Sequence, residues 1–132
     1  MRIISGEFKG KKLLIPNDIQ TRPLKDAVKE SIFNILKHSK FIKYKLQNSI
    51  ILDLFSGVGT FGLECISRNS KHVTFIENHY PALKMLKKNI QNLKCAIKTE
   101  VIEENVFLLK ELNIKVKSYE LIFLDPPFKE HK

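Results

Sequence analysis

The chain has 132 residues, the size of one domain, and 43% of them are hydrophobic, which excludes a chain disordered by composition. No apolar run approaches the roughly 18 residues of a membrane span, and the N-terminus turns polar too early for a signal peptide. Cys65 and Cys95 form no CxxC pair, so we expect two buried thiols in a reducing cytoplasm and no metal site.

The formal net charge is +9, which favours a polyanionic partner. Residues 1–45 contain eleven Lys and Arg against four Asp and Glu, whereas residues 46–132 contain twelve against ten. A genome-wide preference for lysine would spread the charge evenly. We therefore divide the chain into a basic extension, residues 1–45, that faces nucleic acid and a core, residues 46–132.

The extension begins with "RIISGEFKGKKLLIP", two short apolar runs around a polar middle with glycines, which predicts a β-hairpin. A loop follows, and Pro23 then occupies the start of a helix, where its missing N–H costs nothing. Apolar residues at helical spacing predict the buried face of this helix. They are Leu24, Val28, Ile32, Ile35 and Leu36.

Strands and helices alternate in the core. "SIILDLF" is a continuous apolar run, typical of a parallel strand that is buried on both faces. A glycine-rich turn and a helix over 60–69 follow, then strand 72–77, helix 81–93, a weak strand over 99–106, a short helix over 106–112 and strand 119–125. This order predicts an α/β fold with an open, mostly parallel sheet and right-handed crossovers. The predicted core face of helix 81–93 is Ala82, Leu83, Leu86, Ile90 and Leu93.

Ligands of such sheets bind at the carboxyl ends of the strands. Asp53, Glu77, Asn105 and Asp125 all lie at or just beyond those ends. "DLFSGVGTFG" also follows the first strand, and its Gly57-x-Gly59-x-x-Gly62 spacing fits both NAD and S-adenosylmethionine (SAM). A carboxylate at Asp53 would repel a pyrophosphate but suits the ammonium of SAM, which has no phosphate.

"DPPF", residues 125–128, follows the last strand. Two prolines alone would end a strand. With Asp and Phe around them, they also suit methylation of an exocyclic amino group on a base. Asp125 and the Pro126 carbonyl can accept from the amino N–H groups, and Phe128 offers a ring on which a base can stack.

These motifs, in this order, resemble those of SAM-dependent methyltransferases with a Rossmann-like sheet. "MRIISGEFKGKKL", "TRP" and "VKESIFNIL" closely resemble the bacterial RsmD-like family, which methylates guanine N2 in 16S ribosomal RNA. The resemblance implies a SAM pocket and a target site. The SAM residues are Asp53, Phe55, Gly57, Gly59, Glu77 and Asn105, and the target residues are Asp125, Pro126, Pro127 and Phe128.

The resemblance also implies that the basic extension approaches ribosomal RNA or the small-subunit particle, and we expect a monomer that does not bind membranes. The RNA-facing residues are Arg2, Lys9, Lys11, Lys12 and Arg22. The family has Asp where this chain has Asn105, whose oxygen can still accept, and Glu104 is an alternative. The family sheet also continues past four strands, so we expect the fourth to lie at an exposed edge.

Three other functions stay open. The same tetrapeptide could serve adenine N6 in RNA or DNA, the chain could bind RNA without catalysis, and the glycine loop could hold NAD.

Overall fold

The computed structural model describes residues 1–18, 24–39, 46–108 and 118–126. A four-stranded sheet lies at its centre, and every neighbouring pair of strands is parallel, as predicted. The strand order is β3-β2-β1-β4, so the chain moves outward in one direction from β1 and then returns to its other side. The strands are β1 (Ile50–Leu54), β2 (His72–Ile76), β3 (Thr99–Ile102) and β4 (Leu121–Leu124).

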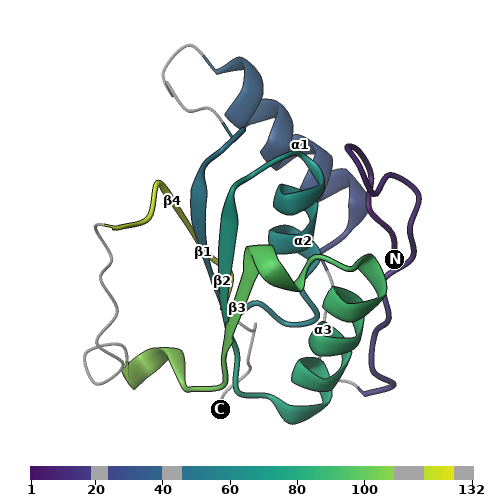
Figure 1. Cartoon of the computed structure of the whole chain (residues 1–132), viewed down its shortest axis with the longest axis vertical. Coiled ribbons are helices and arrows are strands. Elements are labelled where there is room, and N and C mark those ends of the chain that lie inside the picture. Colours follow the sequence, from purple (N-terminus) through teal and green to yellow (C-terminus); the bar gives the residue numbers. More distant parts are fainter. Residues whose placement is uncertain (19–23, 40–45, 109–117, 127–132) are drawn as a thin grey trace.

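Three α-helices lie on one side of this sheet (Figure 1). They are α1 (Asp26–His38), α2 (Thr60–Ser67) and α3 (Tyr80–Leu93). Two short 3-10 helices, η1 (Ala96–Lys98) and η2 (Val106–Leu108), flank β3. Among the described residues, no helix is long and apolar enough to cross a bilayer.

Strand β1 is buried on both faces, which explains its continuous apolar run. Ile51 points into the main core between the sheet and the helices, and Leu52 points into a smaller cluster on the opposite face. The predicted face of α3 is buried at all five positions, together with Asn89. Strand β4 lies at the edge of the described sheet, as expected, and Ile122 and Leu124 on it are exposed.

The predicted buried face of α1 is partly wrong. Val28 is 46% exposed and Ile35 is 56% exposed, while the buried residues of the helix are Lys29 and Phe33. Hydrophobic periodicity treats lysine as a solvent-facing residue, so it rotates the predicted face away from the real one. Ile32 and Leu36 of α1, and Leu24 just before the helix, are partly buried and do pack against the core.

The N-terminal hairpin is present in a minimal form. Its arms meet in one antiparallel bridge, between Arg2 and Lys12, and neither arm forms a regular strand. The turn packs against the end of α2, where a Cβ on Gly6 would lie 2.0 Å from the Ser67 carbonyl oxygen. Ile3 and Leu13 belong to the same core cluster as the sheet residues.

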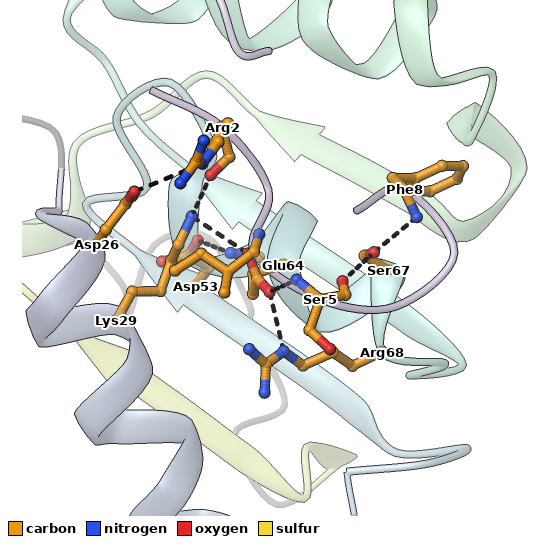
Figure 2. A network of polar contacts seen from close by, with 11 residues as sticks. Arg2, Ser5, Phe8, Asp26, Lys29, Asp53, Glu64, Ser67 and Arg68 are labelled. Atoms are coloured by element: carbon orange, nitrogen blue, oxygen red, sulfur yellow. Dashed lines mark hydrogen bonds and ion pairs between the residues drawn. The ribbon is translucent and has the colours of Figure 1, made fainter. Parts of the chain in front are cut away.

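A buried ionic network joins this hairpin to α1 and α2 (Figure 2). Glu64 of α2 is completely buried, and its carboxylate accepts from the Ile4 and Ser5 backbone N–H groups at 3.0 Å each. Lys29 of α1 lies 3.2 Å from the same carboxylate, and Arg68 donates to it at 2.9 Å. Lys29 Nζ also donates to the Arg2 carbonyl at 2.9 Å.

We expect Glu64→Ala to lower the free energy of unfolding by about 3–5 kcal/mol, because it leaves the buried Lys29 ammonium without its counter-charge. Urea denaturation measures the change. Lys84→Ala, on the exposed face of α3, is the control and should change it by less than about 0.5 kcal/mol. Equal losses in the two variants would show that the network contributes no more than a surface residue.

Candidate cofactor and base-binding site

Three carboxylates lie at the carboxyl end of the sheet, beside β1, where the order in which strands are added to the sheet reverses. Leu54, the last residue of β1, pairs with Ile76 on one side and with Leu124 on the other. Glu77 and Asp125 each follow one of these partners, so they flank the loop that leaves β1. This is the position at which open α/β sheets bind their ligands.

Asp53 lies at the centre of this cluster and is 1% exposed. It faces the helices, and its Oδ2 accepts from the Gly62 N–H at 3.0 Å, in the first turn of α2. Burial raises the pKa of Asp53 well above its ordinary value, the Gly62 hydrogen bond opposes that shift, and the charges of Asp125 and Glu77 raise it further. Neighbouring protein atoms also raise the pKa of Asp125 through desolvation, although its side chain reaches solvent.

Glu77 holds the other end of the glycine loop. Its Oε1 accepts from the Gly57 N–H at 2.7 Å, and its Oε2 accepts from the Asn78 and His79 N–H groups at 3.1 and 3.0 Å. In a dinucleotide site the N–H groups of the loop and of the helix N-terminus receive the pyrophosphate. Here two carboxylates already occupy the N–H groups of Gly57 and Gly62.

The three glycines of the motif serve different purposes. Gly57 has φ +58°, and a Cβ on it would meet no atom within 4 Å, so this position is open to a ligand. Gly59 has φ +95°, and a Cβ on it would lie 2.6 Å from Leu86 of α3. A Cβ on Gly62 would lie 2.3 Å from Phe75 of β2. Gly59 therefore permits close packing of the loop against α3, and Gly62 permits close packing of α2 against β2.

Phe55 begins the loop in a left-handed conformation, φ +56°, which is uncommon for an aromatic residue and frequent at functional sites. Its ring packs edge-to-face on Phe107, with the centroids 5.6 Å apart. Phe107 is 81% exposed, and the sequence analysis missed it. The sequence pattern around Phe107 does not predict this contact, because the two rings meet only through the fold.

Asn105 lies beyond β3, and its side chain makes a local hydrogen bond. Its Oδ1 accepts from the Phe107 N–H at 2.8 Å and caps η2. The sequence analysis also missed Ser56, whose hydroxyl is buried in the loop and has no hydrogen-bond partner in the described part of the chain.

The remaining predicted residues are only partly described. Asp125 and Pro126 follow β4 and are exposed, whereas Pro127 and Phe128 lie outside the described residues. Arg2 pairs with Asp26 at 3.8 Å, and Lys9, Lys11 and Lys12 are exposed on the hairpin. Arg22 also lies outside the described residues. No metal-binding group of three or more His, Cys, Asp or Glu occurs among the residues that were described.

The profile of the family described as "Conserved hypothetical protein 95" matches residues 1–132. The chain belongs to this family, the RsmD-like family. It is 39% identical to the ribosomal RNA small subunit methyltransferase D of Haemophilus influenzae, over 97% of this chain and 64% of that protein. It is 35% identical to a putative rRNA methyltransferase of Bacillus subtilis, over 100% of this chain and 69% of the relative.

Solved structures agree with the fold. A putative methyltransferase from Escherichia coli, 31% identical, superposes with a TM-score of 0.77 over 97% of this chain and 64% of its own. An RNA methyltransferase from Salinibacter ruber in complex with S-adenosyl-L-homocysteine is 15% identical, with a TM-score of 0.59 over 76% of this chain and 58% of its own, and supports the fold alone. The predicted Rossmann-like methyltransferase fold is confirmed. The chain spans 64% and 69% of the length of the two curated relatives, and 64% and 58% of the two solved structures.

Asp53→Asn should make the chain more stable relative to the wild type as pH rises. A raised pKa means that the fold favours protonated Asp53, so this contribution is present at acid pH and is lost as pH rises through the raised pKa. Asparagine stays neutral and keeps an oxygen for the Gly62 N–H.

Urea denaturation of both proteins at a series of pH values, from the ordinary range of an aspartate upward, measures this difference. Glu30→Gln, at an exposed position of α1, gives the baseline for removing a surface carboxylate. A stability difference between Asp53→Asn and wild type that did not change with pH would contradict the assignment of a buried, destabilised charge.

Proposed function

We propose that this chain forms the SAM-binding part, and a portion of the target-binding part, of a methyltransferase that modifies guanine N2 in 16S ribosomal RNA. One observation carries the cofactor assignment: Asp53 and Glu77 already occupy the N–H groups of Gly62 and Gly57. A pyrophosphate would have to compete with both carboxylates for those donors and would be repelled by their charge. A cationic ligand without phosphate is attracted by the same arrangement.

The residues at the site fit the chemical groups of SAM. The carboxylates attract its ammonium and sulfonium, and Glu77 is the candidate for the ribose hydroxyls. The exposed ring of Phe107, supported by Phe55, offers an apolar surface for the adenine, and the free hydroxyl of Ser56 could exchange a hydrogen bond with the cofactor's polar groups. Bound SAM supplies an electrophilic methyl group on sulfur.

The target base would enter beside Asp125, on the other side of β1 from Glu77. The guanine amino nitrogen is a weak nucleophile, because its lone pair is delocalised into the ring. Asp125 and the Pro126 carbonyl can hold its N–H groups and direct the lone pair to the methyl, so that catalysis is mainly positioning and electrostatics. The nitrogen gains the methyl, the sulfur keeps the electron pair of the broken bond, and one N–H proton leaves to an acceptor.

The basic extension supports RNA as the substrate. Lys9, Lys11 and Lys12 are exposed on the hairpin, and the network at Glu64 holds the hairpin's backbone firmly against the core. Phosphate contacts of this kind position a nucleic acid without reading its sequence. The relatives from Haemophilus influenzae and Bacillus subtilis are named as rRNA methyltransferases, which favours ribosomal RNA among the possible polyanions.

Calorimetry should detect binding of SAM and of S-adenosylhomocysteine, and no binding of NAD. Gly57→Ala should weaken S-adenosylhomocysteine binding, because the new methyl enters the space that Gly57 leaves open. Gly10→Ala is the matched control, since Gly10 also has a positive φ and open space around it but lies in the hairpin. Each variant should lose about 1–2 kcal/mol of stability from the left-handed alanine.

Only the Gly57 variant should lose affinity for the product. Tight NAD binding by the wild type would refute the cofactor assignment, and equal affinities in the two alanine variants would remove Gly57 from the site.

Asp125→Ala should abolish most methyl transfer and leave the affinity for S-adenosylhomocysteine nearly unchanged, because its hydrogen bond matters most in the transition state. Asp125→Asn keeps an acceptor oxygen and should retain more activity than alanine. Because the relatives are longer, the assay uses this chain and a version extended with the C-terminal residues of the Haemophilus influenzae relative.

Transfer to guanine N2 and to adenine N6 in small-subunit ribosomal RNA is measured separately in each chain. Exclusive adenine methylation would replace the guanine assignment. RNA binding without SAM binding in both chains would favour the non-catalytic alternative. Near-wild-type turnover of Asp125→Ala would refute the target-binding role of "DPPF", whose prolines would then only end the strand.

A further inference from the structure

Residues 14–18 connect the basic hairpin to the carboxyl edge of the sheet. In Figure 1 the purple N-terminal trace runs beside α3 toward the end of the sheet at which the glycine loop lies. Two side chains hold this segment, which we call the strap: Asn89 binds Leu14, and His79 binds Asp18. The same two residues are also connected to the glycine loop, Asn89 through its side chain and His79 through its backbone N–H.

Asn89 makes the first connection directly. It lies on α3 and is 1% exposed. Its Oδ1 accepts from the Leu14 N–H at 2.7 Å, and its Nδ2 donates to the Leu14 carbonyl at 3.1 Å. The same Nδ2 donates to the Val58 carbonyl at 3.1 Å. One buried amide therefore ties the strap to the residue between Gly57 and Gly59.

His79 makes the second connection through one intermediate. Its Nε2 lies 2.8 Å from Asp18 Oδ2, and its backbone N–H donates to Glu77 Oε2. The other oxygen of Glu77 accepts from the Gly57 N–H. The strap is thus linked to two adjacent residues of the loop: to Val58 through Asn89, and to Gly57 through His79 and Glu77.

We infer that Asn89 is a positioning residue for the glycine loop, and that the strap and the loop are ordered together. The reason is the flexibility of the loop. Gly57 and Gly59 have large conformational freedom when they are not held, so the loop needs fixed contacts to keep the conformation that a ligand recognises. A loop that populates this conformation only part of the time binds with a proportionally weaker apparent affinity.

Only the ligand-binding test of the role of Asn89 rests on the proposed function. Ordering of the loop can be observed without any ligand, by hydrogen exchange at the Gly57 and Gly59 amides, which donate to Glu77 and to the Ser56 carbonyl. The hydrogen-exchange test of loop order and the ligand-binding test of the cofactor assignment can therefore fail independently of each other.

The variant is Asn89→Ala, and Ser67→Ala is its matched control. Ser67 is also fully buried and also holds the N-terminal backbone by both a donor and an acceptor, because its Oγ accepts from the Phe8 N–H at 2.9 Å and donates to the Ser5 carbonyl at 2.6 Å. It lies at the last residue of α2, at the end of that helix remote from the loop. Both variants lose anchoring of the N-terminal extension, and only one loses anchoring of the loop.

In the ligand-free chain we expect Asn89→Ala to speed exchange at Leu14, Gly57 and Gly59, and Ser67→Ala to speed exchange at Phe8 while the loop amides keep wild-type rates. For S-adenosylhomocysteine we expect Asn89→Ala to weaken binding about tenfold and Ser67→Ala to change it less than about twofold. His79→Ala, which removes the ring and keeps the backbone N–H, should speed exchange at Gly57 and serves if Asn89→Ala does not fold.

Wild-type exchange rates at Gly57 and Gly59 in both Asn89→Ala and His79→Ala would overturn the inference. Equally fast exchange of the loop amides in Ser67→Ala and Asn89→Ala would also overturn it. Faster loop exchange in a chain whose wild type binds no S-adenosylhomocysteine would leave the positioning role intact and would refute the proposed cofactor instead.

Discussion

The hydrogen bond from the Gly62 N–H to the buried Asp53 carboxylate is the contact on which the site depends. It joins the end of β1 to the first turn of α2 across the glycine loop, at 3.0 Å and out of contact with water. Gly59, the N-cap residue of α2, has no side chain that could cap the helix. Asp53 therefore caps the helix from the strand, and the loop between them is held in a closed shape.

This arrangement carries an electrostatic cost. Burial and two neighbouring carboxylates raise the pKa of Asp53, and a buried charge near like charges disfavours its own ionised form. A cationic ligand removes part of that cost, because it supplies the counter-charge that the protein does not place there. In the proposed role of Asp53, the same buried charge would destabilise the free protein and attract the cationic cofactor. Asp53→Asn should then stabilise the free protein and weaken cofactor binding.

The sequence predicts the features that depend on local pattern. The continuous apolar run of β1, the buried face of α3 and the glycine loop all have signatures within about ten residues, and each is confirmed. The strand ends also predict that Asp53, Glu77 and Asp125 lie at one edge, because parallel strands share their carboxyl edge. The strand register confirms this shared edge, because Leu54 pairs with Ile76 and with Leu124, the residues that precede Glu77 and Asp125.

The features that local pattern cannot predict depend on partners far away in the sequence. Lys29 is buried because Glu64 lies 35 positions further along the chain, and Asn89 is buried because Leu14 and Val58 meet it from two other segments. A lysine or asparagine on a helix otherwise indicates a solvent-facing position. The Phe55–Phe107 pair and the free hydroxyl of Ser56 belong to the same class, since only the fold brings them to the site.

The glycine motif itself shows why spacing alone left the cofactor open. Gly59 and Gly62 are required by packing against Leu86 and Phe75, and any strand–loop–helix unit with this close approach would need them, whatever it binds. What separates a dinucleotide site from this one is the occupant of the loop N–H groups. Where those groups are free, they receive phosphate. Where Asp53 and Glu77 take them, the loop becomes a rigid support beside a negatively charged site, and its chemistry is set by the carboxylates rather than by the glycines.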